Sequence, residues 1–215
     1  MKIIFATGNQ GKMREIREIL CDIDAEVLSV KEAGVELEIE ENGTTFAENA
    51  GIKAQAAADA LLAKDGMREC VVMADDSGLE IDCLNGEPGV YSARYLGEET
   101  PFDIKSRDLL RRMADVQGTD RSARFVCAIA AVFPDGEMVT TQGTVEGVIG
   151  YELRGSNGFG YDPIFELPAY GCTAAELTDE EKNRISHRSR ALERMKEELR
   201  KREKGILGKQ CGKDY

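Results

Sequence analysis

The sequence predicts an α/β fold with a mixed sheet, for three reasons. Short apolar segments of strand character alternate with segments in which apolar residues recur at helical spacing. Two of the strand segments are joined by a tight turn, which makes at least that pair antiparallel. Apolar residues make up 42% of the 215, enough for a substantial core in one domain or in two closely packed lobes.

The N-terminal part of the chain predicts one strand and two helices. Residues 2–6 form a short apolar strand, and residues 12–20 place their apolar side chains on one side of a helix. A polar loop follows this helix. Thr45 and Glu48 then have the spacing of a capping box, which predicts the start of an alanine-rich helix that ends near Ala63.

The middle of the chain predicts two further strands and the start of a third helix. Residues 71–74 are continuously apolar, as in a buried strand. In residues 79–83 apolar and acidic side chains alternate, which is typical of a half-buried strand. Pro101 is suited to the first position of a helix, because its missing N–H is not needed there.

The C-terminal part predicts a hairpin and a further capped segment. Residues 123–133 form a long apolar strand, residues 134–136 a Pro-Asp-Gly turn, and residues 138–148 the antiparallel partner. Thr178 and Glu181 again have capping-box spacing.

The last predicted element is a charged amphipathic helix over residues 188–204. The sequence contains no internal repeat, low-complexity tract or linker. We therefore expect a single domain over residues 1–204, followed by a loose tail over residues 205–215.

The charge and the cysteines restrict the class of protein. The net charge is −12, from 28 basic and 40 acidic residues, so the surface repels nucleic acid and anionic membranes. The sequence lacks both an 18-residue apolar stretch and a recognisable signal peptide. Its six cysteines form no Cys-x-x-Cys pair, so we expect reduced, mostly buried thiols in a cytoplasmic protein.

One candidate anion site lies between the first strand and the first helix. Its residues are Thr7-Gly8-Asn9-Gln10-Gly11-Lys12. Small residues there allow backbone N–H groups to approach an anion at a helix N-terminus, and Lys12 adds a positive charge. The segment is not a Walker A loop, since Met13 stands where a Ser or Thr would bind Mg²⁺. An ordinary tight turn is the alternative.

Asp75 and Asp76 follow an apolar strand and are candidate metal ligands. Adjacent strand residues point to opposite faces, so the two carboxylates converge only if the strand ends there, which Ser77 and Gly78 would permit. Paired carboxylates need a cation between them, and an oxygen-rich site of this kind suits Mg²⁺. A solvated acidic turn is the alternative.

A second acidic pair, Glu40 and Glu41, lies in the polar loop. Lys53 follows Glu41 by twelve residues, inside the predicted helix. It is either a phosphate ligand or a surface lysine, and the acidic pair is either a metal site or part of a solvated loop.

Aromatic and basic residues gather near the C-terminus. The segment Gly158-Phe159-Gly160-Tyr161-Asp162-Pro163 could stack on a base or fold onto the core. Lys182 and Ser186-His187-Arg188 lie close to the start of the last helix. His187 is the only histidine and is either a structural hydrogen-bond partner or part of a site, and Arg188 could donate to a carbonyl or a phosphate.

Taken together, these segments resemble the Ham1-like family of inosine/xanthosine triphosphate pyrophosphatases, which remove non-standard purine nucleotides. The matching segments are Ala6-Thr7-Gly8-Asn9 with Gly11-Lys12, Thr45-Phe46-Ala47-Glu48-Asn49-Ala50 with Lys53-Ala54, Ala74-Asp75-Asp76-Ser77-Gly78-Leu79, Gly89-Val90-Tyr91-Ser92-Ala93-Arg94-Tyr95, Gly158 to Pro163, and Ala175-Glu176-Leu177 through Lys182 to Ser186-His187-Arg188. They span residues 6 to about 190, and their combination is specific.

The resemblance implies an elongated α/β fold of two lobes with a substrate cleft between them, and a homodimer. Glu41 and Asp76 are implied to hold Mg²⁺, with Asp75 supporting the metal site and Asp76 also implied to be the proton acceptor. Glu41 is preferred to Glu40 because of its spacing from Lys53, and the general base is left open among Asp75, Asp76 and Glu48. The residues implied to bind the nucleotide are Thr7, Gly8, Asn9, Gln10, Gly11, Lys12, Lys53, Ser77, Phe159, Gly160, Tyr161, Asp162, Lys182, His187 and Arg188.

The activity implied is hydrolysis of a purine nucleoside triphosphate (ITP, dITP or XTP) to the monophosphate and pyrophosphate. Water would attack the α-phosphorus with Mg²⁺ assistance, and lysines would neutralise the phosphates. Two alternatives are a Maf-like pyrophosphatase for pyrimidine or modified nucleotides and a nucleotide-binding regulator without turnover. The Ser186-His187-Arg188 segment argues against the first, and the acidic set Glu41, Asp75 and Asp76 argues against the second.

Overall fold

The predicted mixed α/β fold is confirmed. The computed structural model describes residues 1–37, 39–64 and 69–210, and in these ranges one seven-stranded sheet has the order β2-β1-β3-β4-β5-β6-β7. β2, β1 and β3 are mutually parallel, and every pair from β3 to β7 is antiparallel. The strands are β1 (Lys2–Phe5), β2 (Glu26–Ser29), β3 (Cys70–Ile81), β4 (Ser122–Val132), β5 (Met138–Ile149), β6 (Phe165–Leu167) and β7 (Cys172–Thr173).

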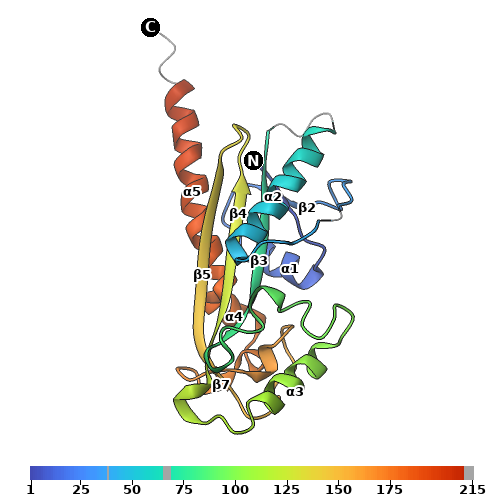
Figure 1. Cartoon of the computed structure of the whole chain (residues 1–215). Helices are drawn as coiled ribbons and strands as arrows, with labels where there is room; N and C mark the ends of the chain where they lie inside the picture. The colour runs from blue at the N-terminus through green and yellow to red at the C-terminus, as the bar shows by residue number, and fades with distance from the viewer. Residues whose placement is uncertain (38, 65–68, 211–215) are drawn as a thin grey trace.

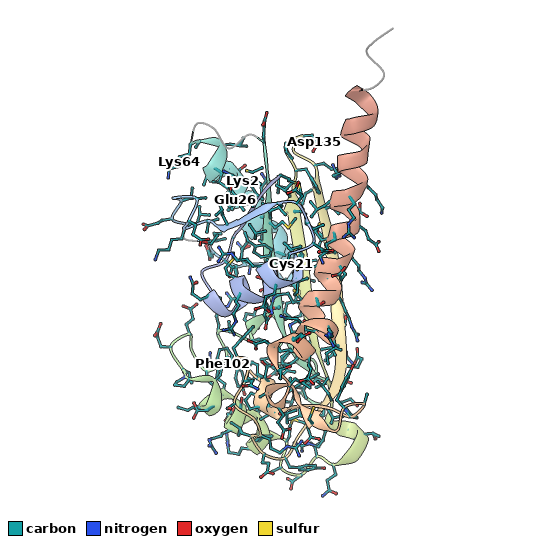
Figure 2. The ribbon with its side chains drawn as sticks, turned by 180° about the vertical axis from the view of Figure 1, so that it is seen from behind. Lys2, Cys21, Glu26, Lys64, Phe102 and Asp135 are labelled. Carbon is teal, nitrogen blue, oxygen red and sulfur yellow. The ribbon has the colours of Figure 1, made fainter. Side chains whose placement is uncertain are left out.

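Helices cover both faces of this sheet, and the molecule is elongated along its long central strands (Figure 1). The helices are α1 (Gln10–Ile19), α2 (Phe46–Leu62), α3 (Phe102–Arg112), α4 (Asp179–Ile185) and α5 (His187–Gln210). Figure 2, seen from behind, shows α5 crossing the face of the sheet opposite to α2. Lys2 and Glu26, labelled there, pair at 3.5 Å between the neighbouring strands β1 and β2.

The alternation of side chains along β3 assigns its residues to two separate apolar layers. Val71 and Met73 pack with α1 and α5, whereas Val72 and Ala74 pack with α2. A third apolar cluster joins α3 to the far ends of β3, β4 and β5. The period of two therefore places Asp75 on the α1 and α5 side and Asp76 on the α2 side.

The difference in length between β1 and β3 opens one edge of the sheet. β1 pairs with β3 only from Lys2↔Cys70 to Phe5↔Met73, whereas β3 continues along β4 to Ile81. Residues 75–78 therefore lie beyond the carboxyl end of β1, with one edge free of a strand partner. Open α/β sheets bind ligands at such carboxyl ends.

Several predicted elements differ from the structure. The prediction of separate strands over residues 71–74 and 79–83 was wrong, because β3 is continuous and pairs with β4 through Asp75↔Ile129 and Asp76↔Ala128. Cys83 lies in a short 3-10 helix after β3. β2, β6 and β7 were not predicted, since each is short and depends on neighbours distant in sequence.

The helix starts were predicted best where a capping box marks them. Thr45 accepts from the N–H of Glu48 at 3.1 Å, and the box at Thr178 is also present. α1 starts at Gln10 rather than residue 12, and Pro101 precedes α3 rather than opening it. α5 continues to Gln210, and the rest of the predicted tail, residues 211–215, lies outside the described residues.

The thiols only partly match the expectation. Cys70 and Cys127 are buried and Cys172 is half-buried, but Cys21 and Cys83 are exposed, and Cys211 lies outside the described residues. Within the described ranges, no helix is long and apolar enough to span a membrane.

A buried arginine ties α3 to the end of β5. Arg121 is 3% exposed, and its guanidinium donates to the carbonyls of Ile149 and Gly150 at 2.6 and 2.5 Å and to those of Met113 and Val116 at 2.9 Å. The replacement Arg121→Met would leave these acceptors without their donor. We expect the free energy of unfolding to fall by about 3 kcal/mol or more in urea titrations.

The matched control is Arg124→Met, which removes an arginine whose side chain is 31% exposed and pairs with surface carboxylates. It should lower the free energy of unfolding by less than about 1 kcal/mol. Equal losses in the two variants would contradict a special role for Arg121.

Candidate active site

Two adjoining chambers lie at the open edge of β3 and together form one cleft. The larger has a volume of about 540 Å³ and the smaller about 410 Å³. Both are lined by Asn9, Lys12, Ile39, Glu41 and Ala93, so the two chambers lie side by side.

The smaller chamber contains the predicted anion turn. Thr7, Gly8, Asn9 and Lys12 line it, and the turn leads from β1 directly into α1. The side chain of Asn9 caps α1 by accepting from the N–H of Lys12 at 3.0 Å, which fixes the turn. A Cβ added at Gly8 would meet nothing within 4 Å, so the backbone there is open to a ligand.

Asp75 contributes its negative charge to a buried network rather than to an acidic pair. Its carboxylate lies 2.8 Å from the ammonium of Lys12 and 3.4 Å from the guanidinium of Arg188. Burial alone would raise the pKa of Asp75, but these two cations outweigh it and lower the pKa. Its carboxylate is therefore held ionised on the α1 side of the sheet.

Asp76 lies on the opposite face and belongs to a different group of charges. The ammonium of Lys53 lies 3.2 Å from Asp76 and 3.0 Å from Glu41, and the amide of Asn49 donates to Asp76 at 3.1 Å. Burial raises the pKa of Asp76 although Lys53 opposes this. Asp75 and Asp76 could converge only if the strand ended there, and this condition is not met, because β3 continues through both.

Glu41 and Asp76 nevertheless share one point in space, the ammonium of Lys53. Burial opposes the charged form of Lys53, but neighbouring carboxylates, Asp76 first, outweigh it and raise its pKa. Two carboxylates that hold one cation also suit a divalent ion, which they would share with substrate phosphates and water. Within the described residues no group of three or more His, Cys, Asp or Glu could hold a metal, so a divalent ion at this pair would need further oxygen ligands from outside the protein.

The larger chamber carries the aromatic residues. Phe159 and Tyr161 line it, and Lys182 lies 4.5 Å from the centroid of the Phe159 ring. His187 stacks on Phe125 with ring centroids 5.0 Å apart. Burial, followed by the nearby cation of Arg188, holds the pKa of His187 well below its ordinary value, so this side chain is neutral at pH 7.

A buried glutamate that sequence reasoning missed connects the basic residues of the cleft. The carboxylate of Glu15 accepts from Arg188 and lies 3.2 Å from the ammonium of Lys182, which also contacts Asp162 at 2.7 Å. Glu15 follows Lys12 by three residues and so lies on the same face of α1. That spacing was the available signal.

Lys182 therefore lies at the aromatic end of the cleft rather than at the anion turn. Burial raises the pKa of Asp162 although the ammonium of Lys182 opposes this. The loop between them is tightly closed: a Cβ added at Gly158 would come within 2.2 Å of the Asp162 carboxylate, and the φ of +74° there also favours glycine.

Most of the predicted site residues come together in this cleft. Those that line one or both chambers are Thr7, Gly8, Asn9, Lys12, Glu40, Glu41, Lys53, Asp75, Ser77, Phe159, Gly160, Tyr161, Asp162, Lys182, His187 and Arg188. Gln10 is exposed and, like Gly11, lines neither chamber. Asp76 lines neither chamber, but it contacts Lys53, which lines the smaller one. Sequence reasoning did not identify Asn49, Ser92, Ala93 and Arg94, although it quoted their segments.

The fold and the cleft define an α/β protein whose open sheet edge joins a glycine-containing turn with Lys12, two carboxylates around the ammonium of Lys53, and an aromatic chamber. The chain matches the Ham1 family over residues 3–198 and belongs to that family.

Relatives and solved structures agree with this assignment. A "dITP/XTP pyrophosphatase" from Clostridium perfringens (strain 13 / Type A) is 48% identical over 206 residues, which cover 96% of this chain and 98% of the relative. The structure of the Staphylococcus aureus Ham1 protein has a TM-score of 0.81 at 42% identity and covers 94% of this chain and all of that one. A HAM1 protein from Coxiella burnetii has the same TM-score at 40% identity, with coverage of 94% and 99%. The predicted family resemblance is thus confirmed.

Proposed function

We propose that this protein hydrolyses the non-canonical purine nucleotides ITP, dITP and XTP to the nucleoside monophosphate and pyrophosphate. One observation carries the proposal: a single cleft joins an aromatic chamber to a basic turn at a helix N-terminus, beside two carboxylates that share a cation. This arrangement suits a ligand with a flat ring at one end and a polyphosphate at the other. The names of the relatives, dITP/XTP pyrophosphatases, support the same substrates.

The anion turn and two lysines bind the triphosphate. The turn from Thr7 to Lys12 presents backbone N–H groups at the start of α1, and Lys12 and Lys53 line the same chamber. In the free protein each lysine pairs with a carboxylate, at 2.8 Å for Lys12 and 3.0 Å for Lys53. When the substrate enters, its phosphate oxygens replace these carboxylates as partners of the lysines or bind beside them. The positive charges of the lysines therefore stay compensated throughout.

Glu41 and Asp76 are the residues that fit a divalent cation, and we assign it as Mg²⁺. When bound, Mg²⁺ neutralises phosphate charge and polarises the attacking water. Of the acidic pair in the loop, Glu41 is the better ligand because its carboxylate already shares the Lys53 ammonium with Asp76. Asp75 supports the site indirectly by holding Lys12 and Arg188.

Asp76 accepts the proton of the attacking water. Its carboxylate is largely buried and is oriented by the amide of Asn49, which donates at 3.1 Å. Burial raises its pKa, which makes it a stronger base than an exposed aspartate. Glu48 is a weaker candidate, because its carboxylate accepts from Thr44 and Thr45 in the cap of α2.

The bond that is cleaved tests the proposal directly. With ITP and Mg²⁺, anion-exchange chromatography should show IMP and pyrophosphate as the first products, and EDTA should abolish their formation. IDP with orthophosphate would contradict attack on the α-phosphorus. Tight nucleotide binding without any product would instead indicate a regulator, and a preference for pyrimidine nucleotides would indicate a Maf-like specificity.

We also propose that the protein acts in the cytoplasm as a homodimer and does not bind nucleic acid. The net charge of −12 supports the last point, because such a surface repels phosphate backbones. Light scattering after size-exclusion chromatography should give twice the mass of the 23.6 kDa chain. A monomeric mass at micromolar concentration would contradict the dimer.

A further inference from the structure

Residues 92–94, here called the wall segment, form a side of both chambers. Ser92, Ala93 and Arg94 line the larger chamber, and Ala93 also lines the smaller one. The segment is part of a turn, and its backbone hydrogen bonds are local: the N–H groups of Ser92 and Arg94 donate to the carbonyls of Gly89 and Tyr91 at 3.0 and 2.9 Å. Side-chain contacts link this turn to more distant parts of the cleft.

Three such contacts join the wall segment to three different parts of the cleft. The hydroxyl of Tyr161 donates to the carbonyl of Ser92 at 2.9 Å. The guanidinium of Arg94 donates to the carbonyl of Glu41 at 3.0 Å. The ammonium of Lys105, from α3, donates to the carbonyl of Ala93 at 2.5 Å. The loop that carries Tyr161, the loop that carries Glu41 and α3 thus meet at three consecutive residues.

Lys105 is unusual among these partners because it is a buried charge without a carboxylate. It is 1% exposed, and among the described residues its ammonium donates to a backbone carbonyl and forms no ion pair with a carboxylate. Its other contact is the ring of Phe102, with the ammonium 4.8 Å from the centroid. Phe102, labelled at the start of α3 in Figure 2, in turn packs edge-on against Tyr161 at 5.2 Å.

Burial of an unpaired ammonium opposes folding. Accordingly, burial lowers the pKa of Lys105, and the more distant Glu98 only partly opposes this. A methionine of similar length would fill the same space without a charge and could keep the contact with Phe102. The structural requirement for packing therefore does not explain why a lysine stands here.

We propose that Lys105 is a positioning residue for nucleotide binding, which holds the wall segment in place through the carbonyl of Ala93. This inference rests on the proposed function, because the ligand whose fit it controls is the purine nucleotide. Lys105 itself lines neither chamber, so it acts through Ala93 rather than by touching the substrate. Ala93 is exposed, and its carbonyl can turn to water when the ammonium is lost. The wall then moves while the core stays intact.

The test is Lys105→Met, measured by binding as well as by turnover. The dissociation constant of IMP, determined by calorimetry, and the KM for ITP should both rise about 10-fold, the scale of one lost charge-assisted hydrogen bond. The kcat should change less than about threefold, because no reacting group is altered. The Tm should stay the same or rise, because a buried unpaired charge is removed. Lys105→Arg keeps a donor for Ala93 and should restore part of the affinity.

The matched control is Lys196→Met in α5. Lys196 is also buried, at 3% exposure, but pairs with Asp22 and Glu193 at 2.6 and 2.7 Å, away from the cleft. Its loss should lower the Tm and leave IMP binding and KM unchanged. Lys105→Met should therefore weaken IMP binding without lowering the Tm, whereas Lys196→Met should lower the Tm without weakening IMP binding.

The outcomes separate the inference from the proposed function. If wild type binds IMP and Lys105→Met binds it equally well, Lys105 has no positioning role and the inference fails alone. A lower Tm with unchanged affinity, as in the control, would also assign Lys105 a purely structural role. If wild type binds neither IMP nor ITP, both proposals fall together.

Discussion

Replacing Asp76 with asparagine should lower kcat for ITP by about 10²-fold or more, while nucleotide binding falls much less. The substitution preserves shape and the contact with Asn49, but it removes both a charge beside Lys53 and the proposed proton acceptor. Loss of a general base has an effect of about this size. The measurement is steady-state turnover of ITP together with equilibrium binding of IMP.

The control for this variant is Asp82→Asn, which removes a carboxylate just after β3 that pairs with Arg124 on the surface. It should leave kcat within about twofold, since exposed pairs contribute little. If Asp76→Asn keeps a kcat close to that of wild type, Asp76 takes no part in the mechanism. The general base would then have to be another residue of the cleft.

The largest effect on kcat/KM is expected from a change of the nucleobase in the substrate. Hypoxanthine and xanthine carry a carbonyl at C6, whereas adenine carries an amino group there. A hydrogen-bond donor of the protein can bond to the C6 carbonyl. Opposite the C6 amino group of adenine, donor faces donor, and both groups are left without a hydrogen-bond partner. Sites built in this way can reject the analogue by up to roughly 10⁵-fold, so kcat/KM for ATP should be far below that for ITP. Comparable values would refute the argument.

Arg188 is the predicted donor, and the structure limits how it can act. Its two terminal nitrogens already contact Glu15, Asp75 and Ser77. These contacts use at most three of its five N–H groups. Its Nε is buried and has no hydrogen-bond partner in the described part of the chain, so its N–H is one of those left for a ligand.

The informative variant is Arg188→Lys rather than Arg188→Ala. The lysine keeps a positive charge for the buried carboxylates, whereas alanine would leave them unpaired and destabilise the protein. We expect kcat/KM for ITP and XTP to fall while that for ATP stays low. The preference for ITP and XTP over ATP should therefore become smaller. An equal fall for all substrates would make Arg188 a structural or phosphate-binding residue, and the base reader would lie elsewhere.

Guanine needs a separate explanation, because it shares the C6 carbonyl. Rejection of GTP must come from its C2 amino group, through a clash or an unpaired donor near Phe159 to Asp162. The comparison of kcat/KM for ITP, XTP, GTP and ATP measures this discrimination. A kcat/KM for GTP equal to that for ITP would contradict it.

What the sequence by itself determined was local. The hairpin of β4 and β5 follows from a long apolar strand and a Pro-Asp-Gly turn, and the starts of α2 and α4 follow from capping boxes. These signals depend on residues within a few positions of one another, so they can be read without the fold. The order of short motifs along the chain was equally sufficient to predict the family.

Only the tertiary structure decided how the charges are grouped. Asp75 and Asp76 are adjacent in sequence, yet the pleat of a continuous β3 sends one to Lys12 and Arg188 and the other to Lys53 and Asn49. Cations from separate helices stabilise carboxylates inside a strand, and no local pattern shows this. The roles of Glu15 and Lys105 likewise depend on partners brought close by the packing of helices and the closing of loops.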